Sequence, residues 1–241
     1  MNTALAQTTA PDNYSCGDSQ NNHCYAFYQW YGSINGGKTD ITVPFLGGRP
    51  GTDGFMNWET WILQNYNSGC GNINYACWVE AGISDACCTL GEYFWADERP
   101  GGGYHNHYTY QVGPDDYIER FQIYRQDSTD WYVSGSVVSC GYPYTCSHSW
   151  SGLSTSNTYS PDEIQIGIEL AGTYGQPGYG ADWTNNYWRC GGNWCPQNSL
   201  GNPGSGPSWI FGIKQGPLTG DWITEPSKTS TGDWNAYCAS C

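Results

Sequence analysis

The stretch that decides the fold is IQIGIEL (residues 164–170), in which an apolar residue occupies every second position. Successive side chains of a β-strand point to opposite faces, so this alternation predicts a strand whose isoleucines face a core. Glu169 then lies on the other face. The stretch WVEAG (residues 78–82) places Trp78 and Glu80 on one face by the same count. Two strands that each present a carboxylate in this way are suited to acid–base chemistry.

The composition favours an all-β fold in one large domain. The chain has 241 residues, including 33 glycines, with 16% aromatic and only 12% charged residues, and no stretch shows sustained helical periodicity. Short strands between turn residues predict an antiparallel double-sheet β-sandwich, similar to the concanavalin-like jelly roll, with disulfide-stapled loops. We expect a loop-rich stretch from 174 to 207, and strands at 25–31, 40–46, 56–63, 76–82, 92–96, 104–112, 117–126, 131–138, 163–171, 208–214 and 221–224.

Twelve cysteines indicate an oxidising compartment, because a cytosolic protein would have to keep all of them reduced. We therefore expect a secreted, extracellular protein. Most cysteines have a near neighbour across a short turn, so local disulfides are the simplest pairing, although spacing alone leaves the connectivity open. Cys87 and Cys88 are adjacent, and the near pairs are Cys16/Cys24, Cys70/Cys77, Cys140/Cys146, Cys190/Cys195 and Cys238/Cys241.

The histidines and cysteines do not favour a metal site. His105 and His107 share a strand face, but two histidines alone make an incomplete site. Cys238 and Cys241 have a zinc-like spacing without a second half of suitably spaced ligands. We expect no metal and no other cofactor.

The first residues resemble the end of a cleaved leader, with an Ala-x-Ala site at residues 4–6. We therefore expect residues 1–15 to be a leader remnant and a flexible N-terminal segment, and residues 16–241 to form a single β-sandwich domain.

The charge balance argues against two classes of partner. The formal net charge is −14, with 8 Lys and Arg against 22 Asp and Glu. A nucleic acid or an anionic membrane surface would be repelled over most of such a surface. No apolar run is long enough for a transmembrane helix. The sequence pI near 4.3 fits an acidic working environment.

One motif matches a nucleotide-binding pattern in full: GSINGGKT (residues 32–39) satisfies G-x-x-x-x-G-K-[ST]. A phosphate-binding loop needs a helix N-terminus directly after its lysine. Here Thr39 leads into DITVP, which predicts a strand, so we interpret the motif as a glycine-rich turn.

The segment WVEAG (78–82), followed by EYFWAD (92–97), resembles a core pattern of the neprosin-type glutamic peptidases, in which a Glu-Ala-Gly strand precedes an aromatic strand ending in Trp-x-Asp. The order is also similar to that of the related eqolisin peptidases. In those, a Trp-containing strand, a Gln-x-Gly strand, an aromatic strand and a later catalytic Glu strand correspond here to 58–64, Glu80, 93–95 and Glu169. The Gly of the neprosin Trp-Gly-Gly-Glu pattern is kept at Gly167, and its Trp is not.

The resemblance implies two carboxylates on one concave face, one activating water against a peptide carbonyl and the other donating a proton. Glu80 and Glu169 take these positions. Trp78 would form an apolar wall that raises the carboxyl pKa, Gln165 would help to hold an oxyanion, and Trp95 would complete the substrate-binding set. Because carboxylates that share a proton split their pKa values, such an enzyme works in acid. The prediction is a secreted acid peptidase acting on peptides or proteins.

Two other classes remain open from the residues alone. Thirteen Trp and twenty Tyr on short strands could stack on sugar rings, as in a carbohydrate-binding module or a glycosidase that uses the same carboxylates for polysaccharide. A non-catalytic extracellular fibre or matrix protein could instead self-assemble by exchanging the N-terminal segment before Cys16 as a strand.

Overall fold

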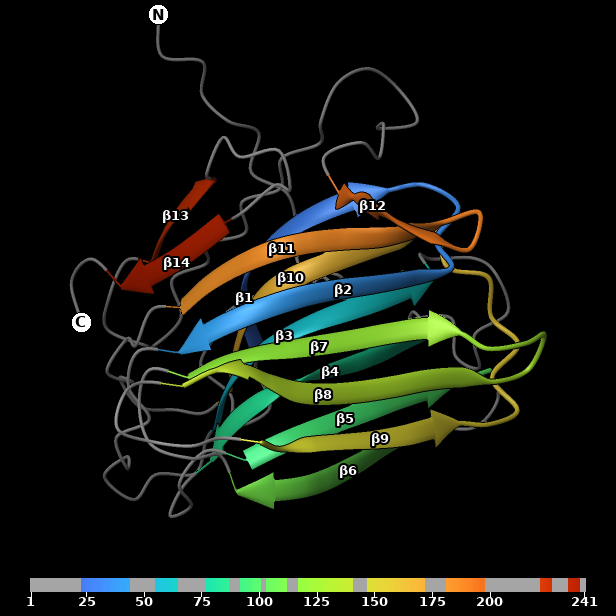
Figure 1. Ribbon diagram of the computed structural model, residues 1–241, viewed down its shortest axis with the longest axis horizontal. Coiled ribbons are helices and arrows are strands. Elements are labelled where there is room, and N and C mark those ends of the chain that lie inside the picture. Colours follow the sequence, from blue (N-terminus) through green and yellow to red (C-terminus); the bar gives the residue numbers. More distant parts are fainter. Residues whose placement is uncertain are drawn as a thin grey trace, which may run out of the picture.

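The computed structural model describes residues 23–43, 55–64, 77–86, 92–100, 103–111, 117–140, 147–171, 181–197, 222–226 and 234–238. These residues form two antiparallel sheets that pack as layers of a sandwich (Figure 1). The all-β, double-sheet prediction is confirmed. Within the described ranges, no helix is long and apolar enough to cross a membrane.

The six-stranded sheet carries both strands on which the sequence predictions rest. Its strands follow the order β1 (His23–Tyr31), β10 (Glu163–Ala171), β3 (Phe55–Gln64), β4 (Cys77–Ala86), β5 (Glu92–Arg99) and β6 (Gly103–Gln111). The eight-stranded sheet follows the order β13 (Trp222–Pro226), β14 (Trp234–Cys238), β11 (Ala181–Cys190), β2 (Gly36–Val43), β7 (Tyr117–Arg125), β8 (Trp131–Ser139) and β9 (Ser149–Ser154), with β12 (Asn193–Pro196) paired to β11.

The core lies between the sheets and uses the alternation seen in the sequence. Three alternate positions of β10 are fully buried isoleucines, and β7 of the opposite sheet contributes Phe121 and Ile123. The tryptophans of the two sheets fill the remaining space, as expected for the large apolar area of aromatic side chains. The fully buried residues of the core include Trp58, Ile62, Trp131, Ile164, Ile166, Ile168 and Trp183.

Tight packing between the sheets makes a glycine necessary on β9. A Cβ added to Gly152 would lie 2.6 Å from the ring of Trp95, which is buried between the sheets. Gly152→Ala is therefore expected to lower the free energy of unfolding by about 1–3 kcal/mol in urea denaturation, because a packed ring cannot move aside without strain. Ser151→Ala, on the neighbouring exposed position, is the matched control. An equal loss in both variants would contradict this account.

The prediction of a loop-rich stretch from 174 to 207 is wrong, because β11 and β12 lie within it. Strand β11 contains a β-bulge that interrupts the alternation in its sequence. Its pairing with β2 shifts register between Thr184 and Tyr187, and Asn185 has a left-handed φ of 51°. The extra residue breaks the period-2 pattern on which the sequence prediction depends. Strand β9 was also missed, and the candidate at 208–214 lies outside the described residues.

The glycine-rich motif 32–39 forms no phosphate-binding loop. Strand β2 begins at Gly36, and no helix follows Lys38. Thr39 lies inside the strand, fully buried, and its hydroxyl donates to the side chain of Asn186 on β11. The interpretation as a turn leading into a strand is confirmed, although the strand begins four residues earlier than its predicted start at residue 40.

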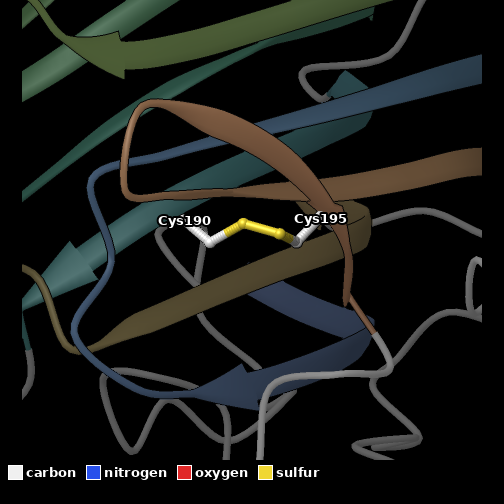
Figure 2. Close-up of a disulfide and its surroundings, with 2 residues drawn as sticks. All are labelled: Cys190 and Cys195. Carbon is white, nitrogen blue, oxygen red and sulfur yellow. A yellow bond between two sulfur atoms is a disulfide. The ribbon is translucent and has the colours of Figure 1, made fainter.

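One of the near cysteine pairs is seen directly. Cys190 and Cys195 form a disulfide across the turn between β11 and β12, with their Cα atoms 5.9 Å apart (Figure 2). Gly191 and Gly192 provide the left-handed φ values of 55° and 88° that this turn requires. Cys77 and Cys140 are also disulfide-bonded.

Removing this bridge is expected to have a moderate effect. A double replacement, Cys190→Ser with Cys195→Ser, should lower the free energy of unfolding by about 2 kcal/mol, because closing so short a loop removes little entropy from the unfolded chain. Thermal unfolding under non-reducing conditions measures the change. A double variant that no longer folds would show that the bridge stabilises more of the protein than this hairpin.

Candidate active site

Three glutamates from adjacent strands meet on one face of the six-stranded sheet. Strand β3 lies between β10 and β4, and its Glu59 pairs with Gly167 on one side and Gly82 on the other. Glu80 is two residues from Gly82, and Glu169 is two residues from Gly167. Diagonal neighbours of this kind lie about 7–8 Å apart, within reach of long side chains. The carboxyls thus form a diagonal line with Glu59 in the middle.

This face is opposite to the one that packs against the eight-stranded sheet. The isoleucines of β10 point into the core, so Glu169, at an odd position, points the other way. The prediction that Glu80 shares a face with Trp78 follows the same alternation on β4. The three carboxyls are nonetheless buried: Glu59 is 0% exposed, Glu80 5% and Glu169 7%.

Burial has a direct electrostatic consequence. Loss of hydration raises the pKa of Glu80 to about 8, and the nearby charge of Glu169 adds to the increase. The pKa of Glu59 is raised well above its usual range, first by burial and then by the charges of Glu80 and Glu169. Carboxyls that would ionise in water near pH 4 therefore keep protons at neutral pH.

Hydrogen-bond donors are distributed unevenly over the carboxyls. Asn57 donates from Nδ2 to Oε2 of Glu169 at 3.0 Å. Donor groups around Glu80 oppose the increase in its pKa without cancelling it, and they belong to Trp61, Trp78 and Tyr104. Trp61 is the cross-strand partner of Glu80, and the rings of Trp78 and Tyr104 lie 6.1 Å apart, with Tyr104 52% exposed. The aromatic groups thus border the Glu80 end of the cluster.

The glycine beside Glu59 on β4 is required by packing. A Cβ on Gly82 would lie 2.2 Å from the backbone oxygen of Trp58 and 2.6 Å from the Cβ of Glu59. A side chain at this position would push β3 and β4 apart exactly where the carboxyls meet. Glycine in a strand interior often marks such a close approach.

The other candidate residues from the sequence have different positions. Gln165 shares the face of Glu169, and its Nε2 donates to the carboxyl of Glu163, whereas its Oε1 has no hydrogen-bond partner among the described residues. Trp95 pairs with Ala81 and is buried between the sheets, on the opposite face from Glu80. Trp95 therefore does not join the carboxyl cluster, because its register on β5 turns the ring toward the core.

Glu59 was missed at the sequence level. The strand pattern places it on the same face as Asn57 and Trp61, opposite the buried Trp58 and Ile62. The alternation in FMNWETWILQ predicts which face of the strand Glu59 occupies. It does not predict that β3 lies between the strands that carry Glu80 and Glu169.

No group of three or more His, Cys, Asp or Glu side chains in the described ranges is arranged to hold a metal ion. His105 is exposed, whereas His107 stacks on the ring of Trp95, with the ring centroids 3.9 Å apart. The two histidines therefore have different environments despite their shared strand face.

The double-sheet sandwich is similar to the fold of solved glutamic peptidases. Scytalido-glutamic peptidase with a peptide-based transition state analog is similar to this chain, with a TM-score of 0.59 and 9% identity, over 90% of this chain and 98% of that one. A second structure of scytalido-glutamic peptidase, with a transition state analog inhibitor, has a TM-score of 0.57 at 9% identity and the same coverage. The eqolisin SCP-B in complex with the tripeptide Ala-Ile-His has a TM-score of 0.47 at 10% identity, over 92% of this chain and 99% of that one.

At this identity the likeness establishes the fold. No protein-family model and no curated protein matches the sequence. The finer resemblance to the neprosin-type peptidases stays a prediction.

Proposed function

We propose that this chain is an acid peptidase in which Glu80 and Glu169 hydrolyse a peptide bond with a water molecule. The observation that carries the proposal is the pair itself: two interacting, buried carboxyls with different donors on one face of a glutamic peptidase fold. Groups whose environments separate their proton affinities are suited to divide the acid and base roles.

Glu80 is assigned as the acid. Its pKa of about 8 means that it holds a proton throughout the acidic range. A neutral carboxyl can donate a hydrogen bond to the carbonyl oxygen of the scissile bond and transfer its proton as negative charge develops there.

Glu169 is assigned as the base. The amide of Asn57 donates to its Oε2 and so stabilises the charged form of the carboxyl. Water would lose a proton to Glu169 while its oxygen forms a bond to the carbonyl carbon. The protonated Glu169 then returns that proton to the leaving nitrogen as the carbon–nitrogen bond breaks. Glu80 takes its proton back from a hydroxyl of the intermediate, which leaves a free carboxylic acid and an amine.

The substrate side of the site is proposed to be lined by aromatic groups. Trp78 is partly exposed beside Glu80, and Tyr104 lies against it. We propose a peptide as the ligand, because scytalido-glutamic peptidase, which has a similar fold, was solved with a peptide-based transition state analog. Neither polysaccharide binding nor self-assembly through the N-terminal segment gains such support. Secretion remains part of the proposal, in keeping with the disulfides.

The test is cleavage of a denatured general protein substrate by the intact, disulfide-bonded chain from pH 3 to 7. Mass spectrometry of the products should show new peptide termini within this range, in which Glu80 keeps its proton. Absence of cleavage at every pH would reject the peptidase proposal.

A further inference from the structure

Glu59 lies between the proposed acid, Glu80, and the proposed base, Glu169. Its side chain is completely buried, and its cross-strand partners on both sides are glycines. Neither neighbouring strand therefore places a side chain directly beside the Glu59 carboxyl. The groups that reach it are the diagonal ones, Glu80 and Glu169, together with Asn57 of its own strand.

A negative charge would be less well supported on Glu59 than on either neighbour. Three aromatic groups oppose the increase in the pKa of Glu80, whereas only the amide of Asn57 opposes that of Glu59. Asn57 also makes a hydrogen bond of 3.0 Å to Glu169. Among the described residues, neither carboxyl oxygen of Glu59 has a hydrogen-bond partner of standard geometry. An ionised carboxyl buried beside two others would be very costly, whereas a neutral acid can donate its proton to a neighbouring carboxylate.

We propose that Glu59 is a positioning residue: a neutral acid that donates a hydrogen bond to Glu169 and confines the negative charge of the cluster to that carboxylate. The role rests on the proposed peptidase function, since it acts through the base of that reaction. The proximity of the Glu169 carboxyl is consistent with it, since the interaction with Glu169 raises the pKa of Glu59 and so favours its protonated form.

Several titratable groups of the six-stranded sheet lie on this face. Those that influence Glu59 are Glu80 on β4 and Glu169 on β10. The remaining carboxyls at the same face belong to Glu163 on β10 and to Glu92 and Glu98 on β5, which pair outside the central row. The protonation of Glu59 therefore depends first on its burial and then on the two proposed catalytic groups.

The first readout is independent of activity. Infrared spectroscopy of the folded protein at pH 6 detects the C=O band of carboxyls that stay protonated when ordinary ones are ionised. Glu59→Gln should remove part of that band, and Glu169→Gln should move the loss of the Glu59 band to lower pH, because a neighbouring negative charge disappears. Glu119→Gln removes a separate contribution, since Glu119 lies in the core with a pKa of about 7.

The second readout is the pH profile of peptide cleavage. Glu59→Gln keeps a donor toward Glu169 and should keep kcat within about tenfold of wild type in acid, whereas Glu59→Leu removes the donor and should lower kcat roughly 100-fold with little change in KM. Rescue by Gln but not by Leu distinguishes positioning from volume filling. Glu92→Gln on β5 is the control of matched charge.

Each outcome decides a different question. An acid band unchanged in Glu59→Gln would show that Glu59 is ionised and would overturn the inference, as would a wild-type kcat in folded Glu59→Leu. If neither the wild type nor any variant cleaves peptide, the peptidase proposal fails. The hydrogen bond from Glu59 to Glu169 is still supported in that case, provided that the C=O band of the protonated carboxyls changes as expected.

Discussion

Glu169→Gln is expected to lower kcat/KM for peptide cleavage by roughly 1,000-fold, because the amide cannot accept the proton that water must lose. Glu80→Gln should cost less, about 100-fold, since its amide still donates a hydrogen bond to the carbonyl oxygen but has no proton to transfer. The order of the two effects follows from the assignment of base and acid to Glu169 and Glu80. Steady-state kinetics at the acidic optimum measures both.

The matched control is Glu92→Gln, which removes the same charge from β5. Glu92 is partly exposed and pairs with Ser84, at the end of the row rather than between the carboxyls. Its kcat/KM should stay near wild type. Equal activity in Glu169→Gln and Glu92→Gln, with both folded, would remove Glu169 from the mechanism.

The second large effect concerns stability, which should be greater in acid than at pH 8. The pKa of Glu80 is about 8 in the folded chain and near the ordinary value of 4.5 when unfolded. Between these values the folded state binds more protons than the unfolded state, so the free energy of unfolding falls as the pH rises. The stabilisation by the protonated Glu80 is fully present below pH 4.5 and disappears as the pH rises through about 8. It is on the order of a few kcal/mol of unfolding free energy.

Two variants separate this effect from the general charge of the molecule. Glu80→Gln should flatten the curve of unfolding free energy against pH between about 4.5 and 8. Near pH 8 the free energy of unfolding of the variant should exceed that of wild type. Glu92→Gln should run parallel to wild type. Urea denaturation at a series of pH values gives the curves. Parallel curves for Glu80→Gln and wild type would show that Glu80 is not protonated in the folded state.

A buried carboxyl in the core acts in the same direction. Glu119 on β7 faces the hydroxyl of Tyr93 across the sandwich, and burial raises the pKa of Glu119 to about 7. Its proton is also held by the folded chain and lost on unfolding above pH 4.5. Acid conditions therefore favour both the proposed chemistry and the folded state.

The alternation of apolar and polar residues within single strands predicted much of the fold. The alternation in 164–170 assigned the isoleucines to the core and Glu169 to the outer face, and the same count paired Trp78 with Glu80. It succeeded because side-chain direction in a strand depends only on position within that strand. It failed at β11, where a bulge interrupts the period, and at the exact start of β2.

What the sequence by itself determined is that a two-sheet sandwich presents Glu80 and Glu169 from the outer faces of their strands, whereas the pairing of Cys190 with Cys195 came from the structure. Tertiary structure alone decided that β3 lies between β4 and β10, which brings Asn57 to Glu169 across 112 residues of chain and inserts Glu59 between the two carboxyls. It also turned Trp95 toward the core. The physical reason is that facing within one strand is a local property, whereas strand order and register arise from backbone pairing between segments far apart in the chain.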